Sequence, residues 1–113
     1  MRNNITRSRL AFTATIVLIG FVVTAQANAA ATTQIEIEKF AFSQKEITVP
    51  PGTTVVWVNH DETPHTIAAS DKSFTSKALD TDDRYEHTFD HEGDGPYFCT
   101  VHPFMTGIVH VRK

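Results

Sequence analysis

The chain has 113 residues, of which 41% are hydrophobic and 20% charged, and its formal net charge is −3. This length and composition suit one globular domain, and the chain carries no repeat with a solenoid period. A net negative charge argues against nucleic acid and anionic membrane surfaces as partners, because like charges repel.

The N-terminal segment has the pattern of a secretory signal peptide. Three arginines precede an uncharged apolar stretch at residues 10–23, and two overlapping small-x-small cleavage patterns occupy residues 25–29. We therefore expect residues 1–29 to be removed and residues 30–113 to form the mature domain. An uncleaved anchor is the alternative, but the apolar stretch is shorter than the roughly 20 residues that span a bilayer.

Cleavage would change the net charge of the protein, and export would change the compartment in which it works. The three arginines leave with the signal and no acidic residue does, so the formal net charge falls from −3 to −6. Export would also place the single cysteine, Cys99, in an oxidising compartment. An unpaired thiol is at risk there unless it is buried, paired with another chain or bound to a metal.

The mature segment shows short strand patterns separated by turn residues, with few helix signals. Several runs alternate apolar and polar side chains or are rich in β-branched and aromatic residues. Phe74 and Leu79 are expected to anchor a polar loop with one short strand at residues 70–83. Seven or eight short strands predict an all-β, antiparallel Greek-key sandwich or barrel. They are expected at residues 34–40, 47–49, 53–58, 66–69, 84–89, 96–99 and 107–111.

The most informative motif lies near the C-terminus, where Cys99, His102 and Met105 follow one another at intervals of three residues. A thiolate, two imidazoles and a weak axial thioether are the ligands of a copper ion that cycles between Cu(II) and Cu(I). His65 is the expected second imidazole, because it follows the strand pattern at residues 53–58 and lies in a polar loop. The predicted ligands are His65, Cys99, His102 and Met105.

Each of these residues also has a purely structural interpretation. A lone Cys or Met usually fills a core, and a lone His near a strand end is usually a surface residue. The regular spacing of three ligand types in one short loop between strands favours the metal site. The other four histidines lie in polar loops or on strand faces and are expected outside this site: His60, His87, His91 and His110.

These motifs resemble those of the cupredoxins, the small type 1 blue copper proteins, and within them the amicyanin group. The likeness rests on residues 56–59, on Pro64-His65 and on residues 97–105, with the two-residue gap between His102 and Met105 as the amicyanin-like feature. The resemblance implies a cupredoxin β-sandwich holding one copper. It also implies single-electron transfer by a monomer in the periplasm of a Gram-negative bacterium. The expected partners are redox proteins: a donor such as a dehydrogenase, and an acceptor such as a c-type cytochrome or an oxidase.

The resemblance also suggests roles for residues around the ligands. Asn59 is expected to hydrogen-bond across to the cysteine loop near Thr100, and Pro103 and Phe104 to keep the surroundings of His102 rigid and apolar. His102 is then the point where electrons enter and leave. Where amicyanins have Pro before this His, the chain has Val101, which keeps its N–H. If that N–H pointed at the Cys99 sulfur, the reduction potential would rise.

Other functional classes fit the sequence less well. A copper-trafficking protein is the main alternative, although such proteins use Met-rich or His-rich tracts and the chain has two methionines, one of them Met1. A copper enzyme would need His-x-His clusters for a second centre, and the sequence has none. A Cys-His hydrolase would need a third orienting group, and none is evident. We therefore expect an electron carrier rather than an enzyme.

Overall fold

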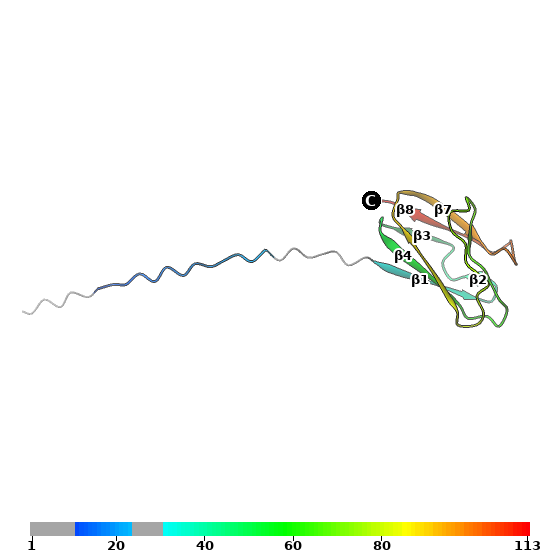
Figure 1. The fold of residues 1–113 in the computed structure, drawn as a ribbon, viewed down its shortest axis with the longest axis horizontal. Coiled ribbons are helices and arrows are strands. Elements are labelled where there is room, and N and C mark those ends of the chain that lie inside the picture. The colour runs from blue at the N-terminus through cyan, green and yellow to red at the C-terminus, as the bar shows by residue number, and fades with distance from the viewer. Residues whose placement is uncertain (1–10, 24–30) are drawn as a thin grey trace, which may run out of the picture.

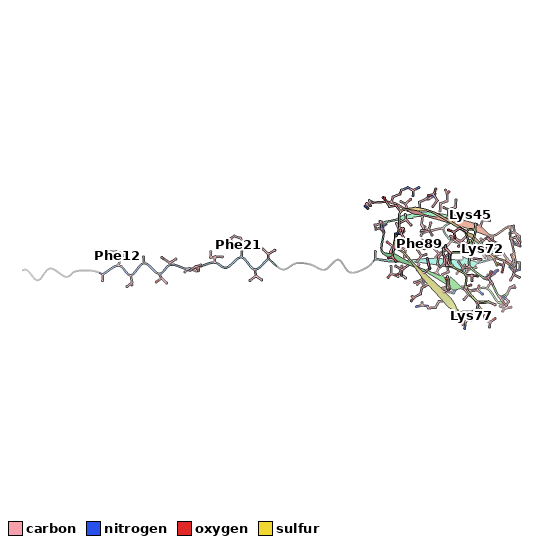
Figure 2. All side chains as sticks on the ribbon, turned by 45° about the horizontal axis from the view of Figure 1, so that its top comes forward. Phe12, Phe21, Lys45, Lys72, Lys77 and Phe89 are labelled. Atoms are coloured by element: carbon pink, nitrogen blue, oxygen red, sulfur yellow. The ribbon has the colours of Figure 1, made fainter. Side chains whose placement is uncertain are left out.

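The computed structural model describes residues 11–23 and 31–113. The predicted signal-cleavage region and the three N-terminal arginines lie outside the described residues. Residues 11–23 form neither helix nor strand, and Phe12 and Phe21 on this segment are exposed (Figure 2). Within the described part of the chain, no helix has the length and hydrophobicity needed to cross a membrane.

In the described residues, eight strands form two four-stranded sheets, in the orders β2-β1-β4-β6 and β3-β8-β7-β5. The two sheets pack against each other (Figure 1). Buried hydrophobic side chains from both sheets form one core between them, as expected for a β-sandwich. The strands are β1 (Thr32–Glu38), β2 (Ala41–Phe42), β3 (Glu46–Val49), β4 (Thr53–Asn59), β5 (Ala68–Ala69), β6 (Arg84–Phe89), β7 (Gly93–Phe98) and β8 (Thr106–Val111).

The predicted all-β sandwich is confirmed, and four of its six strand pairs have the predicted antiparallel arrangement. Strand β1 pairs in parallel with β4, and β3 pairs in parallel with β8. The remaining pairs are antiparallel. Both parallel pairs join strands that are not consecutive in sequence. The chain crosses to the second sheet before β3 and returns to the first sheet after it, so β4 lies beside β1. Each sheet is therefore mixed.

Two local expectations also differ from the structure. The predicted strand at residues 34–40 ends at Glu38, where a two-residue turn leads into the unpredicted strand β2. The predicted short strand within residues 70–83 is absent from this described segment, which makes only isolated bridges through Thr75 and Leu79. Phe74 and Leu79 are nevertheless buried anchors, as expected.

Strand β4 runs through the centre of its sheet, between β1 and β6, and almost all of its residues are buried. Its Trp57 is fully buried and meets Tyr97 of the opposite sheet, with ring centroids 5.2 Å apart in an edge-to-face arrangement. Ile35, Val55 and Val109 add fully buried aliphatic side chains. This packing fixes the two sheets against each other and so fixes the loops at their ends.

Gly107 on β8 lies directly opposite Tyr97 on β7. A Cβ atom at this position would come within 2.4 Å of the Tyr97 ring and hydroxyl. No side chain larger than hydrogen fits there, because the Tyr97 ring is fully buried and cannot swing away. The close approach brings Tyr97 into the core immediately before the cysteine loop.

We predict that Gly107→Ala lowers the free energy of unfolding by about 1–3 kcal/mol, because the added methyl group overpacks the core against Tyr97. Gly95→Ala on the neighbouring strand is the matched control, since its Cβ would meet the edge of Phe89 at 3.1 Å and the Val109 carbonyl oxygen at 3.5 Å, without the 2.4 Å overlap found at Gly107. Denaturant unfolding of both variants provides the measurement. Equal losses of stability in the two variants would contradict the prediction.

Candidate metal centre

Two loops at one end of the sandwich carry the predicted ligands. The connection between β4 and β5 carries His65, and the connection between β7 and β8 carries Cys99, His102 and Met105. Antiparallel pairing of β7 with β8 continues up to Phe98 and Thr106. The seven residues between these strands therefore form a short loop held at both ends by the sheet.

Hydrogen bonds within the cysteine loop fix its shape. The backbone N–H of Cys99 donates to the carbonyl of Met105 at 3.0 Å, and the N–H of Met105 donates to the carbonyl of His102 at 2.9 Å. Cys99 and Met105 are both buried, with exposed fractions of 0% and 3%. The loop thus keeps its two sulfur-containing residues adjacent and inside the protein.

His65 is held from its backbone and from its ring. Its N–H and carbonyl exchange hydrogen bonds with Leu79, at 3.1 and 2.7 Å. Its ring Nε2 lies 2.8 Å from a carboxylate oxygen of Asp61, which accepts the Nε2 proton. This bond selects the tautomer that leaves Nδ1 free to bind a metal.

The structure brings three of the predicted ligands together. Cys99 Sγ lies 3.8 Å from Nδ1 of both His65 and His102, and the two Nδ1 atoms lie 3.2 Å apart. Within the described residues, this is the only group of three or more His, Cys, Asp or Glu donors close enough to hold a metal ion.

These distances fit a metal ion placed among the three donors. Transition metals hold imidazole nitrogen at about 2.0 Å and thiolate sulfur at about 2.3 Å, so at angles between tetrahedral and trigonal the donors around one ion lie roughly 3.3–3.7 Å apart. The observed separations lie within about 0.1 Å of this range. A thiolate with two imidazoles in a trigonal arrangement is the donor set typical of blue copper sites. The residues therefore fit copper in both chemistry and spacing.

The environment of Cys99 favours its thiolate form. Burial of the thiol raises its pKa, but donors outweigh this effect: the Thr66 backbone N–H lies 3.4 Å from the sulfur, and His65 and His102 contact it too. The pKa of Cys99 is lowered to about 6 as a result. A thiolate at neutral pH is the form that binds a metal.

Thr66 joins the two ligand loops. Its hydroxyl lies 2.7 Å from the Thr100 hydroxyl, accepts the Thr100 backbone N–H at 2.8 Å, and lies 3.7 Å from the Cys99 sulfur. This role of Thr66 was not predicted from the sequence. The one available signal was its position directly after His65, which does not by itself reveal its partner.

The predicted bridge from Asn59 to Thr100 is wrong. The Asn59 amide nitrogen donates to the carbonyls of Thr63 and Leu79, and its oxygen accepts the N–H of Asp61. Asn59 is buried at the end of β4, where it braces the loop that precedes His65. All of these hydrogen bonds lie on the His65 side of the site. Thr66, not Asn59, bridges to the cysteine loop.

Among the hydrogen bonds of the described residues, none joins the Val101 N–H to the Cys99 sulfur. The sulfur instead accepts the backbone N–H of Thr66 at 3.4 Å, and a backbone hydrogen bond from His102 also lowers the pKa of Cys99. The chain bends through residues 100–102, so that the N–H of Thr100 faces Thr66. A raised reduction potential therefore no longer follows from the presence of Val101.

Apolar side chains surround the outer edge of the site. His102 is half-buried, whereas Val101, Pro103 and Phe104 are exposed, with 71% of Phe104 open to solvent. Phe40, from the turn between β1 and β2, is 41% exposed and also contacts the His102 ring. The expectation of apolar surroundings for His102 agrees with this arrangement.

The other four histidines lie outside the cluster. His60 and His110 pair with carboxylates at the surface. His87 is half-buried and stacks on Phe74 with ring centroids 4.3 Å apart, and burial lowers its pKa. His91 is exposed. These positions agree with the sequence-based expectation.

With a buried thiolate and two imidazoles converging at the end of a β-sandwich, the class of protein can be stated. Residues 29–112 match the model of the copper-binding proteins of the plastocyanin/azurin family, and the chain belongs to this family. Copper is therefore the metal that it binds.

Particular relatives refine this assignment. The chain is 37% identical to amicyanin from Paracoccus versutus over 69% of this chain and 63% of that protein, so the match spans less than two thirds of that relative. It is 32% identical to amicyanin-alpha from Methylorubrum extorquens, over 90% of this chain and 91% of that one. A purple cupredoxin from Nitrosopumilus maritimus superposes with a TM-score of 0.67 at 36% identity, covering 71% and 99% of the two chains.

We predict that Thr66→Val raises the Cys99 pKa in the metal-free protein, because the sulfur loses a hydroxyl neighbour and Thr100 loses its acceptor. In the unaltered protein, thiolate absorbance in the ultraviolet should develop with a midpoint near pH 6. Thr54→Val is the matched control, because it breaks a similar hydroxyl pair with Thr88 on the surface of the sheet. Identical midpoints in the two variants would count against the role assigned to Thr66.

Proposed function

We propose that this protein is a periplasmic electron carrier in which His65, Cys99, His102 and Met105 hold one type 1 copper. The observation that carries the proposal is the convergence of a buried thiolate with two imidazole nitrogens at spacings of 3.2–3.8 Å. Met105 is buried on the same short loop, which suits it as the weak axial ligand.

The bound copper would accept one electron as Cu(II) and give it up again as Cu(I). The protein contributes a frame that holds its donors in place in both states. His65 is fixed by Leu79 and Asp61, and the cysteine loop by its internal hydrogen bonds and by Thr66. A frame of this kind keeps reorganisation small, which favours electron transfer.

His102 is the proposed point of electron exchange with partners. It is the ligand of the three-donor cluster that is half-buried rather than buried, and apolar side chains lie around it. An exposed apolar patch of this kind favours brief docking of another protein. The patch is formed by Phe40, Val101, Pro103 and Phe104.

The remaining proposals concern location, processing and partners. Residues 1–29 would direct export and be removed, and residues 30–113 would act as a monomer in the periplasm, with no stable membrane insertion. An electron donor such as a dehydrogenase and an acceptor such as a c-type cytochrome or an oxidase are the partners that fit a one-electron carrier. The export pattern at the N-terminus of the sequence supports the proposed location.

The first test is the visible and electron paramagnetic resonance spectrum of the Cu(II)-loaded protein. We expect an intense blue thiolate-to-copper band, which Cys99→Ser should abolish because oxygen cannot replace the sulfur donor. His110→Ala, at a histidine outside the cluster, is the matched control and should leave the band unchanged. A pale spectrum, or copper retained only as Cu(I), would instead favour a copper-trafficking function.

A second test addresses the docking patch. Phe104→Asp should slow electron self-exchange about tenfold or more, because two acidic proteins must bring their patches together and the new charge adds repulsion. The reduction potential should change little, since Phe104 lies at the rim with its ring centroid 6.0 Å from that of His102. Thr88→Asp, exposed on β6, adds the same charge elsewhere. Equal slowing by both variants would exclude a role for this patch.

A further inference from the structure

The turn between β1 and β2 has an unusual backbone. It consists of Lys39 and Phe40, whose φ angles are +51° and +58°. Two-residue turns with both φ angles positive connect hairpins well, but they favour Asn and Gly, because other side chains clash with the backbone in this conformation. A Lys-Phe pair in this conformation is strained, so another interaction must hold it.

Asp61 holds the turn. One carboxylate oxygen accepts the N–H of Lys39 at 2.7 Å, and the other accepts the N–H of Phe40 at 2.9 Å. The second oxygen also accepts the proton of His65 Nε2 at 2.8 Å. A single, largely buried carboxylate therefore joins the strained turn to a ligand of the metal.

The strained turn places Phe40 against both imidazoles. The Phe40 ring stands edge-on to the His65 ring, with centroids 5.3 Å apart, and to the His102 ring, with centroids 5.0 Å apart. The two interplanar angles are 88° and 89°. One aromatic side chain thus covers the pair of histidines where they approach each other.

We propose that Asp61 is a positioning residue that couples the β1–β2 turn to His65, so that Phe40 closes one side of the copper site to small molecules. The inference rests on the proposed copper site. It adds a function for a turn that contributes no metal ligand. It also explains why strain is retained in a turn where Asn or Gly would relieve it.

Loss of copper to a chelator measures how open the site is. The blue Cu(II)-loaded protein is mixed with excess EDTA, and the decay of the blue band is followed. We expect Phe40→Ala to lose copper at least tenfold faster than the unaltered protein, with the spectrum before decay nearly unchanged. Asp61→Ala should lose copper at least as fast and should also shift the spectrum, because His65 is released as well.

Two further variants separate coupling from general damage. The double variant Asp61→Ala with Phe40→Ala should lose copper no faster than the faster single variant, because both changes open the same side. Lys39→Gly added to Asp61→Ala should slow copper loss again, because glycine adopts positive φ without strain. It should leave the spectral shift in place, since His65 still lacks its acceptor.

Asp71→Ala is the matched control, because Asp71 is an exposed aspartate that accepts a backbone N–H from Ser73 in another turn. It should change the rate of copper loss less than twofold. If Asp61→Ala does not fold, Asp61→Asn takes its place, since the amide keeps one acceptor oxygen. Rates and spectra equal to those of the Asp71 variant would overturn the proposal, as would unchanged copper loss in Phe40→Ala.

A measurement without copper completes the test. Nitrogen NMR of the metal-free protein should show His65 in one tautomer with its proton on Nε2, and Asp61→Ala should mix the two tautomers. A single tautomer in both proteins would overturn the link between Asp61 and His65. If the unaltered protein shows no blue band, the proposed function fails; if the band is present and no variant has an effect, this inference alone fails.

Discussion

The hydrogen bonds of Thr66 are the interaction on which the metal centre depends, because they extend the pairing of β5 with β7 to the two loops that carry the ligands. His65 follows β4 of one sheet, whereas Cys99 lies between β7 and β8 of the other. The Thr66 hydroxyl bonds to the hydroxyl and the backbone N–H of Thr100, and the Thr66 N–H points at the Cys99 sulfur. Packing of Trp57 on Tyr97 sets the distance between the sheets, and Thr66 then sets the distance between donors.

Rigidity and exposure are divided between the two imidazoles. His65 is fully buried and is fixed by Leu79 and Asp61, so it serves as the fixed support of the site. His102 is half-buried, and the exposed apolar patch surrounds it, so it can face another protein. Phe40 contacts both rings and links these two parts. An electron carrier needs this combination, because its metal must be shielded from small molecules and yet lie close to its partners.

Local sequence patterns predicted most strands and the grouping of the ligands, because alternation and ligand spacing are properties of short segments. Interactions between distant segments account for the failures. The parallel pairing of β1 with β4 depends on how the chain crosses between the sheets. Strand β2 follows a turn without Asn or Gly, which Asp61 stabilises from 21 or 22 residues away in sequence. Asn59 differs from these cases, because two of its three partners, Asp61 and Thr63, lie in its own loop and only Leu79 is distant in sequence.

The central claim is that one thiolate and two imidazoles surround a single copper ion. X-ray absorption at the copper edge of the loaded protein tests it most directly, because the fine structure identifies the atoms bound to the metal and their distances. The account predicts one short bond to sulfur and two bonds to imidazole nitrogen, in both oxidation states and with little change between them. A shell of nitrogen and oxygen without a short sulfur bond would contradict it.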